Sequence, residues 1–371
     1  MKNKTNLIFL HNIIKAFADS MVKAFVPLII LQNTGNMMLV MLYLCVFYVV
    51  ATLLNYVLKK FLEKYGVIAI ILHIFPIIAM QFLLTLPTSW WLCIVLGLCA
   101  GLDQALYYVP LNILFSFTDK TANVAKFQIA ICVGKLFFIL LSGYVLGSGL
   151  QNSLLWLCVI ATLLYIASVI PILYGFKLLK QQYCKAAENS QKTYDKKTYI
   201  TFNLFHMFMS VFKTTLEVIV PLYLFVNNLS FSSIAIFLAL IELCKIAVNV
   251  LSKFLLKKSR SWWGIVLACV LFVAGFVMIL FVKNQIVLYV ASCVISITYP
   301  LVHVPTLSVF LKKVEADGNQ FDGLVMRDVY IQMAKPVLFV PYFVFPSLVG
   351  QFVVGIGATI GMIFASKKFL K

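Results

Sequence analysis

Charged residues are scarce in this chain of 371 residues. Only 11 % of them are Asp, Glu, Lys or Arg, whereas an ordinary soluble domain has about a quarter. Hydrophobic residues make up 63 %, and the mean hydropathy is +1.02. The shortage of charge excludes an ordinary soluble domain and indicates a protein dissolved in lipid.

Several signatures of soluble chemistry are also missing. The sequence has no phosphate-binding P-loop, so transport driven by ATP would need another subunit. Its nine cysteines have no metal-type pair spacing and nearly all lie in apolar runs, as expected of small core residues in a reduced environment. We expect no metal, no cofactor and no enzymatic activity. No recognition module for nucleic acid interrupts the apolar segments.

Long apolar segments fill most of the sequence. A membrane-spanning helix needs roughly 20 apolar residues, and division at the polar breaks gives twelve such segments. They cover 7–31, 36–58, 66–86, 90–117, 125–147, 153–175, 199–226, 232–256, 263–281, 285–311, 325–346 and 349–366. The sequence therefore predicts an all-α polytopic membrane protein.

The basic residues are distributed unequally between the two sides of the predicted membrane. If the N-terminus is cytoplasmic, nearly all Lys and Arg outside the spans fall in cytoplasmic segments, and the opposite loops hold only Lys283. This is the bias of the positive-inside rule. It predicts a multi-pass protein of the cell membrane with both termini in the cytoplasm, and it accounts for most of the net charge of +18.

Short motifs recur in the same order in the two halves of the chain. Val26-Pro27-Leu28 returns as Val220-Pro221-Leu222, and Gly134-Lys135 returns as Ala334-Lys335 at nearly the same offset. Matches kept in register indicate two halves of the same build. We expect six-helix bundles over 1–176 and 198–371, joined by a Lys-rich cytoplasmic linker over 177–197.

Twelve spans in two repeats, with cytoplasmic termini and a basic central linker, resemble the major facilitator superfamily. That family carries Gly-x-x-x-Asp-Arg-x-Gly-Arg between its second and third helices, and residues 59–67 are the best match here. Glu63, Lys64 and Gly66 fit the acidic, basic and glycine positions, whereas the first glycine and the last basic residue are replaced. The resemblance implies a fold of two pseudo-symmetric bundles and a role for Glu63 in latching the cytoplasmic side. An exposed charged loop is the alternative.

Ionisable residues inside the spans are functional candidates because each is costly to insert into lipid. Lys15, Asp19 and Lys23 lie four residues apart on one helix, and Lys213 and Glu217 occupy the repeat positions of Asp19 and Lys23 with opposite sign. In a two-fold arrangement these residues face one another. We therefore predict gating pairs Asp19–Lys213 and Lys23–Glu217, which bridge the halves on the outer side of the cavity, form when it faces inward and break when it opens outward. Pairing of Asp19 to Lys15 or Lys23 of its own helix is the alternative.

The candidate substrate site centres on Lys135 and Lys335, which occupy equivalent places in the two halves. They either bind an anionic group or form structural pairs with Glu242 or another acid. Glu242 and Lys245 lie three residues apart on one helix face.

Three further residues complete the predicted site. Asp103 is the first candidate for a coupling proton because it lacks a basic partner in the repeat, and Tyr107 follows on the same helix. His303 corresponds to the repeat position of Tyr108 and is the histidine best placed to line a cavity. The other histidines are expected to be packing residues.

Together these features predict a secondary active transporter that works by alternating access. We expect a small, anionic or amphipathic solute, proton coupling, contact with membrane lipids, and a monomer. One alternative is a flippase for lipids or lipid-linked sugars. Another, of a different class, is a transport-inactive membrane sensor or scaffold.

Overall fold

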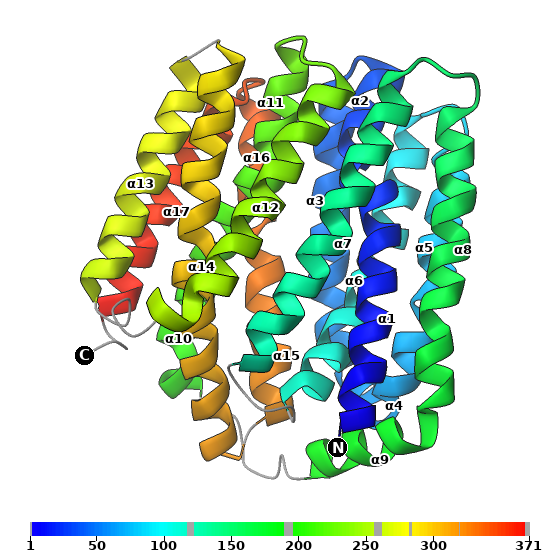
Figure 1. Cartoon of the computed structure of the whole chain (residues 1–371), viewed down its shortest axis with the longest axis vertical. Helices are drawn as coiled ribbons and strands as arrows, with labels where there is room; N and C mark the ends of the chain where they lie inside the picture. Colours follow the sequence, from blue (N-terminus) through cyan, green and yellow to red (C-terminus); the bar gives the residue numbers. More distant parts are fainter. Residues whose placement is uncertain are drawn as a thin grey trace.

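A computed structural model describes residues 2–116, 122–188, 196–255, 262–281, 284–318 and 320–367. Every regular element in these ranges is a helix, and the helices form an upright bundle (Figure 1). The expectation of an all-α polytopic membrane protein is confirmed. We call the end at which the first helix begins the inner end and the opposite end the outer end.

The N-terminal half runs from α1 to α8. Its elements are α1 (Lys2–Met21), η1 (Lys23–Phe25), α2 (Val26–Thr34), α3 (Met37–Val57), α4 (Lys59–Leu72), α5 (Ile74–Leu83), α6 (Trp90–Ser116), α7 (Ala122–Gly147) and α8 (Ser153–Tyr174).

The C-terminal half begins in the same way, with a long helix, a short irregular turn and a short helix. Its elements are α10 (Lys196–Thr214), η2 (Thr215–Ile219), α11 (Val220–Val226), α12 (Phe231–Leu255), α13 (Trp262–Phe281), α14 (Gln285–Ala316), α15 (Gln320–Ala334), α16 (Pro336–Val344) and α17 (Val349–Lys367).

Ten helical stretches among the described residues are long and apolar enough to cross a membrane. The two remaining predicted spans, 7–31 and 325–346, correspond to α1 to α2 and to α15 to α16, which run alongside the other helices (Figure 1). These two spans contain buried charged residues or a break between helices, so neither forms one continuous apolar helix of membrane length. The arrangement is consistent with twelve spans. Lys283, on which the charge bias partly rested, lies outside the described residues.

Proline interrupts three of the spans. A 3₁₀ turn precedes Pro27, a π-helical turn precedes Pro221, and α15 ends two residues before Pro336. Proline lacks the N–H that an α-helix needs and clashes with the preceding turn. The first span of each half is therefore irregular at the same repeat position.

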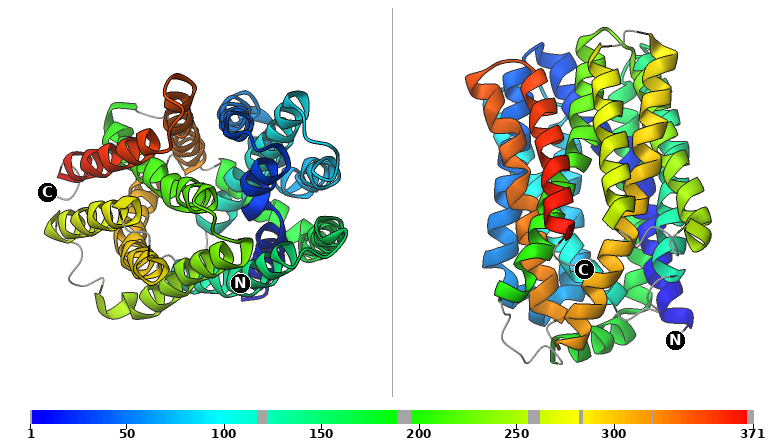
Figure 2. Two further views of the ribbon diagram at one scale, coloured as in Figure 1. Left: turned by 90° about the horizontal axis from the view of Figure 1, so that it is seen from above. Right: turned by 90° about the vertical axis from the view of Figure 1, so that its left-hand side faces the viewer.

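The two halves stand side by side (Figure 2), and both contribute to each of two hydrophobic core clusters. α7 packs along α12, and α3 packs along α15 and α16. Gly143 allows the closest approach, because a Cβ there would overlap Ala235 on α12. The outer ends of the first spans also meet, through α2 and α11.

The predicted linker begins with structure. α9 (Phe176–Glu188) lies across the inner end of the bundle (Figure 1). The hydroxyl of Tyr183 donates a hydrogen bond to the carbonyl of Leu62, 2.6 Å away, and the ring leaves no room for a side chain at Gly66. Residues 189–195 of the predicted linker lie outside the described residues.

The family-like motif at residues 59–67 is helical and is not an exposed loop. It forms the start of α4, where Tyr65 departs from helical geometry (φ −124°, ψ 25°). In this structure the ion pair from this segment to the other half is formed by Lys59, whose Nζ lies 2.9 Å from the carboxylate of Asp322 on α15. Glu63 and Lys64 lie at the same inner end, and the latch role of Glu63 stays a prediction.

Candidate functional site

A central cavity of about 440 Å³ lies between the two halves. The N-terminal half contributes residues of α1, α3, α6 and α7 to its wall, and the C-terminal half contributes residues of α10, α12, α14 and α15. Its size is in the range of pockets for small molecules. The interrupted first span of each half passes along this cavity, with Lys23 and Glu217 facing it.

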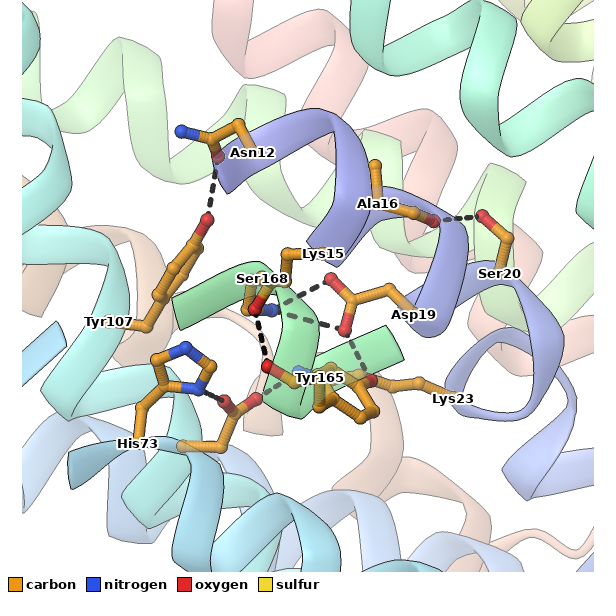
Figure 3. Close-up of polar contacts among 11 residues, drawn as sticks. Asn12, Lys15, Ala16, Asp19, Ser20, Lys23, His73, Tyr107, Tyr165 and Ser168 are labelled. Carbon is orange, nitrogen blue, oxygen red and sulfur yellow. Dashed lines mark hydrogen bonds and ion pairs between the residues drawn. The ribbon is translucent and has the colours of Figure 1, made fainter. Parts of the chain in front are cut away.

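Two ion-paired clusters flank the cavity, one in each half. In the N-terminal half, Nζ of Lys15 lies 2.8 Å from the carboxylate of Asp19 (Figure 3). The hydroxyl of Tyr165 donates a second hydrogen bond to that carboxylate at 2.7 Å. Lys15 is almost fully buried and also lies over the ring of Tyr107, 4.1 Å from its centroid.

Asp103 on α6 extends this N-terminal cluster. It is fully buried and forms an ion pair with Lys23 at the edge of the cavity. Nδ1 of His73 lies 3.1 Å from the other carboxylate oxygen. The hydroxyl of Tyr107 donates to Oδ1 of Asn12 at 2.6 Å, so this tyrosine serves the internal network behind the wall.

The C-terminal cluster is organised around Lys245. Its Nζ lies 2.8 Å from the carboxylate of Glu217 and 3.0 Å from that of Glu242. Lys213 lies 3.7 Å from Glu217 and is the more exposed of the two lysines. Both acids line the cavity.

These contacts differ from the gating pairs that the sequence predicted. Asp19 pairs with Lys15 on its own helix, the alternative stated for it, and Lys23 pairs with Asp103 instead of Glu217. Glu217 pairs with Lys245 and Lys213. The physical reason is proximity within each half, because Asp103 and Lys245 offer an opposite charge without reaching across the cavity. The predicted pairs across the halves are not formed in this structure, and their formation in an inward-facing state stays a prediction.

Three cations of the cavity wall have no acid within ion-pair distance among the described residues: Lys135, Arg327 and Lys335. Lys335 donates a hydrogen bond to Oε1 of Gln332 at 2.9 Å and lies over the ring of Tyr48, 4.5 Å from its centroid. Glu242, the acid considered as a structural partner of Lys135, pairs with Lys245 instead. Among the described residues, no carboxylate therefore forms an ion pair with any of these three cations.

The charges of the wall and of the two clusters sum to a positive value. The cations are Lys15, Lys23, Lys135, Lys213, Lys245, Arg327 and Lys335, and the acids are Asp19, Asp103, Glu217, Glu242 and Asp328. Seven cations minus five acids leave a net charge of +2 with neutral histidines.

Most of the predicted site residues lie together. The cavity wall includes Asp19, Lys23, Lys135, Lys213, Glu217, Glu242, His303 and Lys335. Residues behind the wall are Lys15, Asp103, Tyr107 and Lys245, which contact wall residues or each other. Glu63, Lys64 and Gly66 are not part of the cavity. They lie at the inner end of the bundle, beside α9.

Sequence reasoning missed Arg327. The residue falls near the inner edge of the predicted span 325–346, where a basic residue is expected to belong to the cytoplasmic side. A signal was present, because Leu324, Arg327, Ile331 and Lys335 are three or four residues apart and so share a helical stripe. All four line the cavity.

No group of three or more potential metal ligands occurs within the described residues. The charged side chains of the candidate site are those described above, in ion pairs or as cations without an ion pair among these residues.

Comparison with known proteins agrees with this architecture. The family model of the major facilitator superfamily matches residues 8–320, and the chain belongs to this family. None of the curated proteins matches the chain.

Solved structures share the fold at low sequence identity. A bacterial homologue of the iron transporter ferroportin, in an outward-facing state with soaked iron, is 15 % identical, with a TM-score of 0.68 and 98 % of each chain covered. The human organic anion transporter MFSD10 is 13 % identical, with a TM-score of 0.65 and coverage of 98 % and 99 %. The peptide transporter POT, in complex with sulfate, is 13 % identical, with a TM-score of 0.70 and coverage of 99 % and 94 %. At these identities the likeness concerns the fold alone.

Proposed function

We propose that the chain is a secondary active transporter that moves a small organic anion by alternating access. The observation that carries this proposal is the central cavity, in which Lys135, Arg327 and Lys335 face a common space without an acid within ion-pair distance among the described residues. A charge inside a membrane protein is costly unless it is compensated. An anionic solute would supply the missing compensation.

The rest of the wall favours a solute with an apolar or aromatic body. Tyr43, Phe47, Tyr48, Tyr108 and Tyr299 line the same cavity. Aromatic faces offer large apolar contact area, and Tyr keeps a hydroxyl for a polar edge. An amphipathic organic anion would match both the charge and the lining.

Proton coupling is proposed for the N-terminal cluster. Asp103 is buried between Lys23, which faces the cavity, and His73, which does not. A carboxylate that changes its partner can change its proton affinity. Movement of Lys23 toward a bound anion would leave Asp103 without its cation and favour proton uptake.

The working unit is proposed to be a monomer in the cell membrane with cytoplasmic termini. Both walls of the cavity come from one chain. Alternating access of two such halves around a central site requires no second copy.

A thermal-unfolding panel on purified protein in detergent tests the proposed substrate class. We expect benzoate and other organic anions to raise the unfolding midpoint, whereas choline and glucose leave it unchanged. In Lys335→Gln and Lys135→Gln the shift produced by anions should shrink or vanish. Equal stabilisation by uncharged sugars, or anion shifts that persist in both variants, would contradict the proposal.

A further inference from the structure

Arg327 lies in an unusual environment for a buried guanidinium. It is 7 % exposed, and its Nε has no hydrogen-bond acceptor among the described residues. Asp328, the next residue, accepts a hydrogen bond from Nδ2 of Asn55 in the other half at 2.9 Å. The nearest acid in sequence is thus engaged elsewhere, and Arg327 forms no ion pair in the described part of the chain.

Two histidines accompany Arg327 at the inner part of the cavity. His206 on α10 and Arg327 both contact Phe310, with the imidazole 5.4 Å and the guanidinium carbon 5.7 Å from its ring centroid. His303 on α14 stacks on Tyr299 at 5.2 Å. All three basic side chains line the cavity.

The hydrogen bonds of His206 define what its free nitrogen can do. Nδ1 lies 2.7 Å from the carbonyl of Phe202, and a carbonyl can only accept, so Nδ1 carries the proton. In the neutral ring Nε2 is then an acceptor. This nitrogen is buried and has no partner within the described residues, and the same holds for Nδ1 of His303.

The unsatisfied groups specify a ligand. A guanidinium binds the two oxygens of a carboxylate or phosphate with its planar fork of donors. The acceptor nitrogen of His206 instead requires a donor, which an unsubstituted carboxylate lacks. A buried polar group without a partner is destabilising, so a ligand that satisfies both is favoured over one that satisfies only the cation.

We infer that Arg327, His206 and His303 form the recognition site for the charged end of the solute, and that this end is an oxyanion carrying a hydroxyl. A 2-hydroxy acid or a hydrogen phosphate has this chemistry. The inference rests on the proposed transport of an anion and places its head group in the C-terminal half. Lys335 lies two helical turns farther out on the same stripe, and its role in this arrangement is to compensate the overall charge of the solute.

Isothermal titration calorimetry on the full chain in detergent tests this assignment. Mandelate and phenylacetate are matched probes because they differ by one hydroxyl, and inorganic phosphate tests the other source of a hydroxylated oxyanion. We expect the wild type to bind mandelate at least tenfold more tightly than phenylacetate. Binding of phosphate without either carboxylate would also support the site and would assign its oxyanion as a phosphate.

Variants separate the two parts of the site. His206→Phe should remove the preference for mandelate over phenylacetate, whereas His206→Gln, which keeps an acceptor, should restore part of that preference. Arg327→Gln should weaken every bound anion at least tenfold. Arg327→Lys, which keeps the charge but loses the fork, should give an intermediate loss and serves if the first variant does not fold.

Three outcomes would overturn the inference. Equal binding of mandelate and phenylacetate by the wild type would remove the hydroxyl requirement. Anion affinity that falls in Lys335→Gln but not in Arg327→Gln would leave the proposed function standing and reject this site. The absence of binding by all three probes would count against both.

Discussion

At the scale of single residues, the site contrasts cations that have an acid with cations that have none. Lys23 belongs to the first kind, since it pairs with Asp103, which is fully buried and accepts from both Lys23 and His73. Removing one member of a buried pair leaves the other charge uncompensated. Replacement of Asp103 should therefore lower the free energy of unfolding strongly.

Asp103→Asn is expected to lower the free energy of unfolding by about 3 kcal/mol, because Lys23 would lose its ion pair in a largely buried position. The double variant Asp103→Asn/Lys23→Met should recover much of the loss. Unfolding midpoints in detergent measure both. A single variant as stable as the wild type would show that the pair contributes nothing to folding.

Lys335 and Lys245 are both lysines of the candidate site, but their replacement is expected to change the free energy of unfolding differently. Lys245 contacts two carboxylates, whereas Lys335 has no ion pair in the described residues. Lys245→Met should lower the free energy of unfolding by about 3 kcal/mol, while Lys335→Met should leave it unchanged or raise it by about 1 kcal/mol. Unfolding midpoints of both variants in ligand-free detergent measure this difference. A loss in Lys335→Met as large as in Lys245→Met would mean that Lys335 has a structural partner.

At the scale of elements, the close contact between α7 and α12 depends on glycine. A side chain at Gly143 would overlap Ala235, so Gly143→Leu should force the helices apart and cost about 1 to 3 kcal/mol of stability. Gly357 on α17 has open space around its Cβ position and is the matched control. Gly357→Ala should be neutral or slightly stabilising. Equal unfolding midpoints for the two variants would contradict the packing.

The elements themselves could largely be predicted from sequence. Apolar runs of membrane length and the repeated Val-Pro-Leu motif anticipated the spans and their order, because the cost of exposing polar backbone to lipid leaves little choice but helices. The short helix α9 was missed. Its apolar residues Phe176, Leu179 and Tyr183 have helical spacing, but the segment is short and rich in lysine, and its position depends on Tyr183 meeting Leu62 and Gly66.

Charge partners could not be predicted in the same way. The equal spacing of Lys15, Asp19 and Lys23 allows several pairings, and sequence gives no distance to Asp103 or across the cavity. The choice is made by tertiary packing, which brings Asp103 to Lys23. Arg327 was missed for a related reason, because a position near the edge of a span does not reveal that the side chain faces inward.

At the scale of the whole molecule, the inner end is bridged by the ion pair of Lys59 and Asp322, which joins the two halves. Both side chains are partly exposed, so the pair is worth about 0 to 1 kcal/mol. An interaction of this size changes the balance between conformations more readily than it changes folding.

Charge reversal at this pair tests its role in alternating access. We expect Lys59→Asp and Asp322→Lys each to alter the transport rate several-fold with little change in unfolding midpoint, and the double reversal to restore the rate. Uptake by reconstituted vesicles measures this. Rates that stay at the wild-type value in both single variants would show that the bridge does not influence the cycle.

The most direct test of anion transport through the central cavity is uptake of radiolabelled mandelate by proteoliposomes under an inward proton gradient. The account predicts accumulation by the wild type, its collapse on addition of a protonophore, and near-background uptake in Lys335→Gln. Wild-type uptake no greater than that of protein-free vesicles, or undiminished uptake in Lys335→Gln, would contradict it.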